Sequence, residues 1–143
     1  MIITDDPEAI RRVLLGSKTI AVVGCSNKPD RDSYQIAQAL IDRGYDVIPV
    51  NPGAAEILGR KCYPDVKSIP KKVDIVDVFR RAEETPAIAD DAVAIGARAL
   101  WLQLGISSEE AARRASDGGL IVVMDNCIGQ TVSKTGVHAR AES

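Results

Sequence analysis

Short apolar runs alternate with amphipathic stretches along most of the chain. Residues 20–23 are Ile, Ala, Val and Val without a polar interruption, a pattern typical of a strand buried on both faces of a parallel sheet. Comparable runs predict four further strands, at residues 46–50, 73–79, 99–103 and 120–124. Apolar positions with helical spacing predict helices between them, over residues 4–15, 32–44, 85–95 and 107–118.

Residues that favour helix starts precede each helical stretch. We expect side-chain oxygens of the following residues to cap the four helices: Asp5 or Asp6, Asp32 or Ser33, Thr85, and Ser107 or Ser108. Asp32 and Gln35 also have the spacing of a capping box. Residues 61–63 are expected to form a short edge strand, and the polar tail from residue 129 to be either a short helix or frayed.

Strands that alternate with helices, at about 25 residues per unit, indicate right-handed βαβ crossovers. The predicted fold is therefore α/β: a single Rossmann-like, doubly wound, mainly parallel sheet of five or six strands with helices on both faces. We expect one domain over residues 1–143, with a core at about residues 10–130.

The amino-acid composition and net charge argue against some kinds of binding partner. The chain is 45% hydrophobic and 27% charged, with a net charge of −2, which is typical of a soluble globular protein and gives no global attraction to nucleic acid or to an anionic membrane. No apolar run reaches the roughly 18 residues of a membrane span, and the acidic start is unlike a signal peptide. We expect a cytoplasmic protein whose anion site, if present, is local.

Cysteine and histidine are sparse. Cys25, Cys62 and Cys127 are widely spaced and odd in number, and His138 is the one histidine. This pattern favours neither a disulfide framework nor a zinc site, so we expect no metal.

The loop after the first predicted strand has the features of an anion site. In a doubly wound sheet, ligands bind at the carboxyl ends of the strands, which here are followed by residues 24–33, 51–54, 79–83, 103–106 and 125–129. Gly24 allows the chain to turn and a ligand to approach closely. Lys28 and Arg31 supply positive charge before a helix N-terminus, where free N–H groups attract anions. We therefore predict a phosphate-bearing nucleotide at residues 24–33.

The same loop departs from the NAD-binding pattern. Of GxGxxG only Gly24 is present, with Ser26 and Pro29 at the later positions. NAD sites place an acid after the second strand to bind a ribose hydroxyl, whereas this chain has Asn51 followed by Pro52. Asn51 would spare a ribose phosphate the repulsion of a carboxylate, so both departures count against NAD.

Five segments in order, VVGCSNKPDRDSY, VIPVNP, VDVFR, LWLQLG and VVMDNC, resemble the stand-alone CoA-binding domain family, which is similar to the CoA-binding domain of the succinyl-CoA synthetase alpha subunit. The resemblance covers about residues 10–130. That alpha subunit continues into a domain with a phosphorylated histidine, which this chain lacks, and His138 is no match for it. Ligase activity is therefore not implied.

The resemblance implies a site for coenzyme A at these segments. It implies contacts with the diphosphate or 3′-phosphate from Gly24, Ser26, Asn27, Lys28 and Arg31, and with the adenosine from Val50, Asn51 and Pro52. It places Phe79 and Arg80 near the diphosphate and pantetheine, and Gln103, Gly105, Asn126 and Cys127 at the pantetheine end.

Cys25 and Ser33 are also expected at the cofactor site, and several positions have a second interpretation. Ser33 is foremost a helix cap that could also touch an anion, and Cys25 is either a packed small residue or a thiol activated by the helix N-terminus. Cys127 could approach the thiol of CoA and form a mixed disulfide. Trp101 is expected in the core, and Arg81 is expected to pair with Glu84.

No catalytic constellation is apparent, because no nucleophile lies beside a base in the pattern. We expect a non-catalytic protein that binds CoA or an acyl-CoA, with no nucleic acid or membrane partner. The alternatives are an NAD(P)-dependent oxidoreductase, an accessory subunit of an acyl-CoA enzyme, and an interaction module with a vestigial ligand site.

Overall fold

A parallel sheet forms the centre of the molecule. A computed structural model describes residues 1–140, in which five strands lie in the order β2-β1-β5-β6-β7, every neighbouring pair parallel. The strands are β1 (Thr19–Val23), β2 (Asp46–Val50), β5 (Ile75–Val78), β6 (Ala99–Leu102) and β7 (Ile121–Val123). The predicted doubly wound α/β fold is thereby confirmed, with five strands in the sheet.

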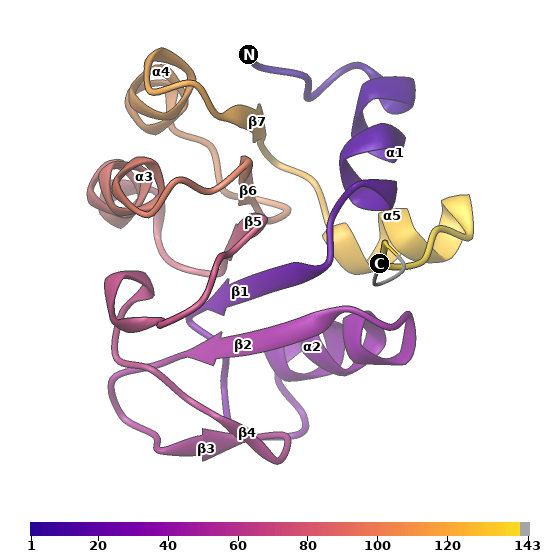
Figure 1. The fold of residues 1–143 in the computed structure, drawn as a ribbon, viewed down its shortest axis with the longest axis vertical. Coiled ribbons are helices and arrows are strands. Elements are labelled where there is room, and N and C mark those ends of the chain that lie inside the picture. The colour runs from indigo at the N-terminus through magenta and orange to yellow at the C-terminus, as the bar shows by residue number, and fades with distance from the viewer. Residues whose placement is uncertain (141–143) are drawn as a thin grey trace.

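Helices cover both faces of the sheet (Figure 1). They are α1 (Pro7–Leu15), α2 (Asp32–Asp42), α3 (Thr85–Ala94), α4 (Glu109–Asp117) and α5 (Ile128–Thr135). Residues of α1, α2 and α5 pack in one apolar core, and those of α3 and α4 pack in a second core on the opposite face. Because apolar residues on both sides of each strand are buried, the strands read as continuous hydrophobic runs.

The first core contains Trp101, which is fully buried on β6. Its indole Nε1 donates to the carbonyl oxygen of Asn126 at 2.8 Å, so the ring fills the core while its polar atom is satisfied. The expected core position of Trp101 is confirmed.

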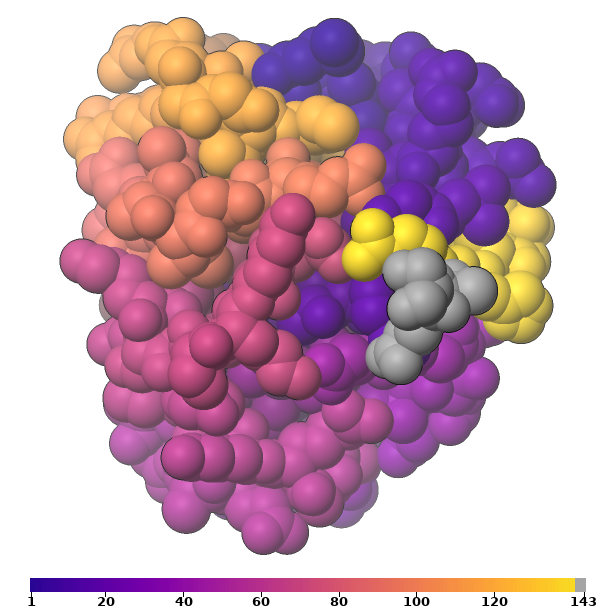
Figure 2. Space-filling model, in the orientation of Figure 1, coloured from indigo at the N-terminus to yellow at the C-terminus, as the bar shows by residue number. Residues whose placement is uncertain are grey.

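The N-terminal segment packs against β7 and α4. Ile2 makes a parallel bridge to Val122, and the Met1 amino group donates to Ser116 Oγ of α4 at 2.8 Å. Accordingly, the indigo N-terminal segment adjoins the orange α4 region in Figure 2, and the yellow α5 region lies beside α1. None of the helices within residues 1–140 combines the length and apolar character that a membrane crossing requires.

Helix starts differ in part from the sequence prediction. Asp6 caps α1 by accepting from Ala9 N, and Ser108 caps α4 by accepting from Ala111 N. The helix predicted from residue 4 therefore begins only at Pro7. Thr85 caps nothing, since its hydroxyl donates to the Ala82 carbonyl oxygen of a preceding 3₁₀ turn (η2, Ala82–Glu84).

The capping box predicted at Asp32 and Gln35 is also absent. Arg31 occupies the N-cap position of α2 and makes no side-chain cap bond. Gln35 Nε2 donates instead to the Pro29 carbonyl oxygen at 3.3 Å. The prediction was wrong because α2 starts one residue too early for Asp32 to act as its cap.

The edge strand predicted at residues 61–63 takes another form. β3 (Glu56–Ile57) and β4 (Arg60–Lys61) make a separate antiparallel pair, and Tyr63 forms only an isolated parallel bridge to Val50. A short 3₁₀ turn, η1 (Val66–Ser68), then leads toward β5.

Strand order reverses at β1, which has β2 on one side and β5 on the other. In open α/β sheets the crevice at such a reversal is where ligands bind. The loops that leave β1 and β5 therefore mark the candidate site.

Candidate functional site

Gly24 ends β1 in a conformation that suits glycine. Its φ is +85°, a left-handed value that costs other residues about 1–2 kcal/mol. A Cβ placed there would lie 2.9 Å from the Phe79 carbonyl oxygen. The neighbouring strand ends are tied to this turn, because Gly24 N donates to Val50 O at 2.9 Å and Phe79 N donates to Val23 O at 2.8 Å.

Side-chain hydroxyls hold the next loop in a compact turn. Ser26 N donates to the oxygen of Ser33 at 2.9 Å, and Lys28 N donates to Ser26 Oγ at 3.0 Å. Arg31 N in turn donates to the Lys28 carbonyl oxygen at 3.0 Å. Ser33 is buried, so it braces the loop rather than capping α2.

The N-terminus of α2 faces this loop without a side-chain cap. The first N–H groups of a helix have no partner within it, and together with the helix dipole they attract anions. Lys28 and Arg31 line the hollow here, and neither pairs with a carboxylate in the described part of the chain. Asp30 and Asp32 line it as well. We call this hollow of about 570 Å³ the loop cavity.

A second hollow lies on the α3 side of the sheet and is named the α3 cavity. It measures about 350 Å³ and is lined mainly by apolar side chains: Val23, Val50, Pro52, Pro64, Val66 and Ile88. Arg80 and Glu84 stand at its border, joined by an ion pair of 2.7 Å. The hydrogen bond from Arg80 lowers the pKa of Glu84, so the Arg80 charge is already partly balanced.

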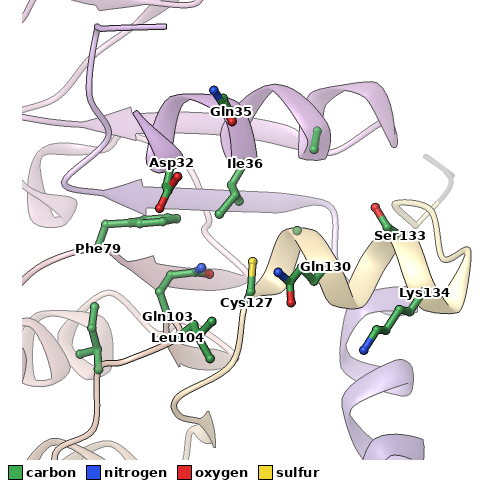
Figure 3. Close-up of a pocket in the computed structure, with 13 residues that line it drawn as sticks. Asp32, Gln35, Ile36, Phe79, Gln103, Leu104, Cys127, Gln130, Ser133 and Lys134 are labelled. Carbon is green, nitrogen blue, oxygen red and sulfur yellow. The ribbon is translucent and has the colours of Figure 1, made fainter. Parts of the chain in front are cut away.

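A third hollow, the α2–α5 cavity, lies on the opposite face and measures about 660 Å³. Side chains of α2 and α5 form its walls, and residues that follow β5 and β6 form its base (Figure 3). Phe79, Ile36 and Leu104 contribute apolar surface, and Gln103 and Cys127 lie between them.

Shared residues join the three hollows into one line. Gly24 borders both the α3 cavity and the loop cavity, while Phe79 and Asp32 border both the loop cavity and the α2–α5 cavity. The line crosses the carboxyl edge of the sheet at the strand reversal. An extended ligand lying along it would meet an apolar hollow, a polar loop that carries Lys28 and Arg31, and a second apolar hollow in that order.

The structure brings most of the predicted site residues to this line. Those that border one of the three cavities are Gly24, Ser26, Lys28, Arg31, Ser33, Val50, Pro52, Phe79, Arg80, Gln103 and Cys127. The predicted residues that border none of them are Cys25, Asn27, Asn51, Gly105 and Asn126.

Three of the residues outside the cavities support loops. Asn51 Nδ2 donates to the Cys25 carbonyl oxygen and Asn51 Oδ1 accepts from Gly53 N. Asn126 Oδ1 accepts from the hydroxyl of Thr131, and Gly105 N donates to an Asp125 oxygen. Their polar groups are engaged within the protein.

Cys25 is a packed residue and not an activated thiol. It is fully buried, and burial, followed by the nearby Cys62 and Asp77, raises its pKa to about 12. Of the two interpretations of Cys25, packing of a small residue is confirmed and the thiolate at the α2 N-terminus is not, because the side chain lies in the core. The expected pair of Arg81 with Glu84 is present at 3.4 Å.

The cavity residues that sequence reasoning missed include two groups away from the strand ends. One comprises Gln130, Ser133 and Lys134 on α5, a segment predicted only as a short helix or a frayed tail. The other comprises Asp65 beside η1 and Ile88 on α3. Neither group directly follows a strand of the main sheet. The expectation that ligands bind at the loops after parallel strands therefore does not identify these residues.

Asp77 borders none of the three cavities. It is fully buried on β5, level with Val22 and Trp101 in the neighbouring strands. Neither carboxyl oxygen has a hydrogen-bond partner, and burial raises its pKa well above the usual value. Burial therefore favours the protonated form of the Asp77 carboxyl in the folded protein.

The chain is similar to known proteins over most of its length. The chain is 44% identical over 119 residues to the uncharacterized protein YneT of Bacillus subtilis, which spans 83% of this chain and 88% of that protein. A solved structure of a hypothetical protein from Pyrococcus horikoshii superposes with a TM-score of 0.87 at 41% identity, covering 90% of each chain.

An enzyme relative is matched only in part. The ADP-forming acetate–CoA ligase II of Archaeoglobus fulgidus is 32% identical over 101 residues, which is 68% of this chain but 15% of the ligase. The family model described as a CoA binding domain matches residues 18–132. The chain thus belongs to the family of CoA-binding domains.

Proposed function

We propose that this protein binds CoA or an acyl-CoA along the line of the three cavities. The observation that carries the proposal is their order, because CoA has an aromatic adenine, a charged diphosphate and a pantetheine arm that combines apolar groups with two amides, in the same order. The adenosine would occupy the α3 cavity, the phosphates the loop cavity, and the pantetheine the α2–α5 cavity.

The loop cavity suits phosphate groups. The uncapped N–H groups of α2 provide donors, and Lys28 and Arg31, which pair with no carboxylate among residues 1–140, provide positive charge. Gly24 has no side chain where one would meet Phe79 O, which lets a ligand lie close to the backbone. Asp30 and Asp32 offset the local charge, so recognition would rest on directed hydrogen bonds more than on net attraction.

The outer cavities suit the two ends of CoA. Val50, Pro52 and Ile88 offer a flat apolar surface to an adenine ring, and Phe79 and Leu104 offer one to the pantetheine chain. Leu104 is 63% exposed, and covering such a side chain with ligand removes apolar surface from water. Asp32 at the junction would accept a hydrogen bond from a pantetheine amide.

We further propose that the protein holds its ligand without converting it, in the cytoplasm. Among the described residues that line the three cavities there is no histidine to act as a base. No group of three or more His, Cys, Asp or Glu side chains within residues 1–140 could bind a metal ion. The three free cysteines are consistent with a reducing compartment.

Thermal and calorimetric titration tests this function. At about 100 times its dissociation constant, CoA should raise the free energy of unfolding by roughly 2.7 kcal/mol, and calorimetry should give one site per chain. NAD, NADP and ATP serve as comparison ligands. Stabilisation by NAD without any by CoA would support a dinucleotide enzyme instead, and no response to any of them would support an interaction module.

A further inference from the structure

Cys127 places a thiol inside the α2–α5 cavity. Of the three cysteines, all within residues 1–140, Cys25 and Cys62 are buried and Cys127 alone is partly exposed. Figure 3 shows its Sγ directed from the start of α5 toward Ile36 and the space below α2. No hydrogen bond engages this sulfur among the residues that the structure describes.

Gln103 beside it indicates that this part of the cavity receives a ligand. The residue is 3% exposed, and its Oε1 is held by the N–H of Ile128 at 3.2 Å. The amide nitrogen has no acceptor within the described chain, although the side chain borders the cavity. Only the two Asp77 oxygens are buried without a partner among the described side chains, so the Gln103 amide nitrogen is open to the cavity, where a ligand or water can accept its hydrogen bond.

The order of the cavities determines which part of CoA would reach Cys127. The phosphates would lie at Lys28 and Arg31, and the arm would run past Phe79 toward Gln103 and Cys127. The thiol of CoA ends that arm. The inference rests on the proposed function, because without CoA in this line the two sulfurs would not meet.

We infer that Cys127 is a redox site at which the protein captures CoA as a mixed disulfide. The co-reactant is a disulfide of CoA, such as the symmetric dimer. Cys127, having lost its proton, attacks one sulfur of that disulfide, and a new S–S bond joins the protein to one CoA. The other CoA leaves as a thiolate and takes up a proton, so the Cys127 sulfur is oxidised and the departing sulfur is reduced. A free thiol reverses the step.

Intact mass under non-reducing conditions tests the capture. The full-length protein with CoA disulfide should gain the mass of one CoA less two hydrogen atoms, and dithiothreitol should remove it. The Cys127→Ser variant should gain nothing, whereas Cys62→Ser should behave as the wild type. Glutathione disulfide should react at least tenfold more slowly, because it lacks the groups that the loop and α3 cavities would hold.

A variant in the loop cavity tests whether Cys127 reacts because CoA disulfide is bound in the cavities or only because its thiol is exposed. Lys28→Ala should slow the reaction with CoA disulfide and leave that with glutathione disulfide unchanged. Equal rates with both disulfides, an adduct on Cys127→Ser, or no adduct at all would overturn the inference. Calorimetry of CoA with the Cys127→Ser variant shows which proposal has failed if the wild type forms no adduct. If the variant still binds CoA, only the redox site is refuted. If the variant does not bind CoA, the proposed function is refuted as well.

Discussion

Gly24 and Phe79 are in near contact where β1 and β5 leave the sheet. A Cβ on Gly24 would lie 2.9 Å from the Phe79 carbonyl oxygen, and Phe79 borders both the loop cavity and the α2–α5 cavity. The missing side chain at Gly24 therefore lets the two strand ends approach and lets the cavities on either side join.

Replacing Gly24 tests this close approach. Gly24→Ala should lower the free energy of unfolding by about 2 kcal/mol or more, because the alanine must adopt a left-handed φ and displace backbone atoms. Urea unfolding measures the loss. The matched control is Gly96→Ala, where φ is +72° but nothing lies within 4 Å of the added Cβ. Equal losses in the two variants would show that the contact with Phe79 is unimportant.

Removing either loop cation should weaken CoA binding. Lys28→Ala and Arg31→Ala should each reduce affinity by roughly 10- to 100-fold if they make charge-assisted hydrogen bonds to phosphate. Their unfolding free energies should stay within about 0.5 kcal/mol of the wild type. Calorimetry measures the affinities, with Lys72→Ala as the control because Lys72 is exposed and borders none of the three cavities. Unchanged affinity in both loop variants would show that the phosphates bind elsewhere.

Asp77 should make the folded protein less stable as the pH rises. Burial raises the pKa of Asp77 in the folded protein, while the pKa of an Asp in the unfolded chain is about 3.9. Between these values the folded state holds a proton that the unfolded state has lost, so unfolding is favoured progressively with pH. Asp77→Val should therefore raise the unfolding free energy at pH 7.5 by roughly 1–3 kcal/mol, and by less at pH 5.

Asp74, three residues before Asp77, is the matched control because its carboxyl accepts two hydrogen bonds. Its Oδ2 accepts from the N–H groups of Lys18 and Thr19 at 2.8 and 3.1 Å. Asp74→Val removes the acceptor of both hydrogen bonds and should lower stability by about 1–3 kcal/mol. Urea unfolding at pH 5 and pH 7.5 measures the free energy of unfolding of both variants. A loss of stability in Asp77→Val would show that the Asp77 carboxyl has a partner in solution.

The three thiols should differ in reactivity in the folded protein. Cys127 should react with a thiol reagent such as Ellman's reagent at pH 8, while Cys25 and Cys62 should stay unmodified until the chain is denatured. Burial raises the pKa of both protected thiols, that of Cys25 to about 12, and only the thiolate reacts. Stopped-flow absorbance counts the sites, and a rapid second thiol in the native state would contradict the buried placement.

Local pattern determined the strands and the loop that carries the site. The apolar run at β1, Gly24 after it, and Lys28 and Arg31 before α2 follow rules that involve neighbours in the chain, so they are legible without a structure. The alternation of strands and helices similarly determined the doubly wound sheet, since the handedness of crossovers leaves few topologies.

Tertiary structure decided which of the loop residues border a cavity and which brace it. Asn51 and Cys25 occupy adjacent loops, and only their hydrogen bond at 2.9 Å shows that the amide is used internally. Ser133 and Lys134 of α5 lie across a cavity from α2, about 100 residues away in the chain. Burial and contact between distant segments depend on packing, and no spacing within one segment encodes them.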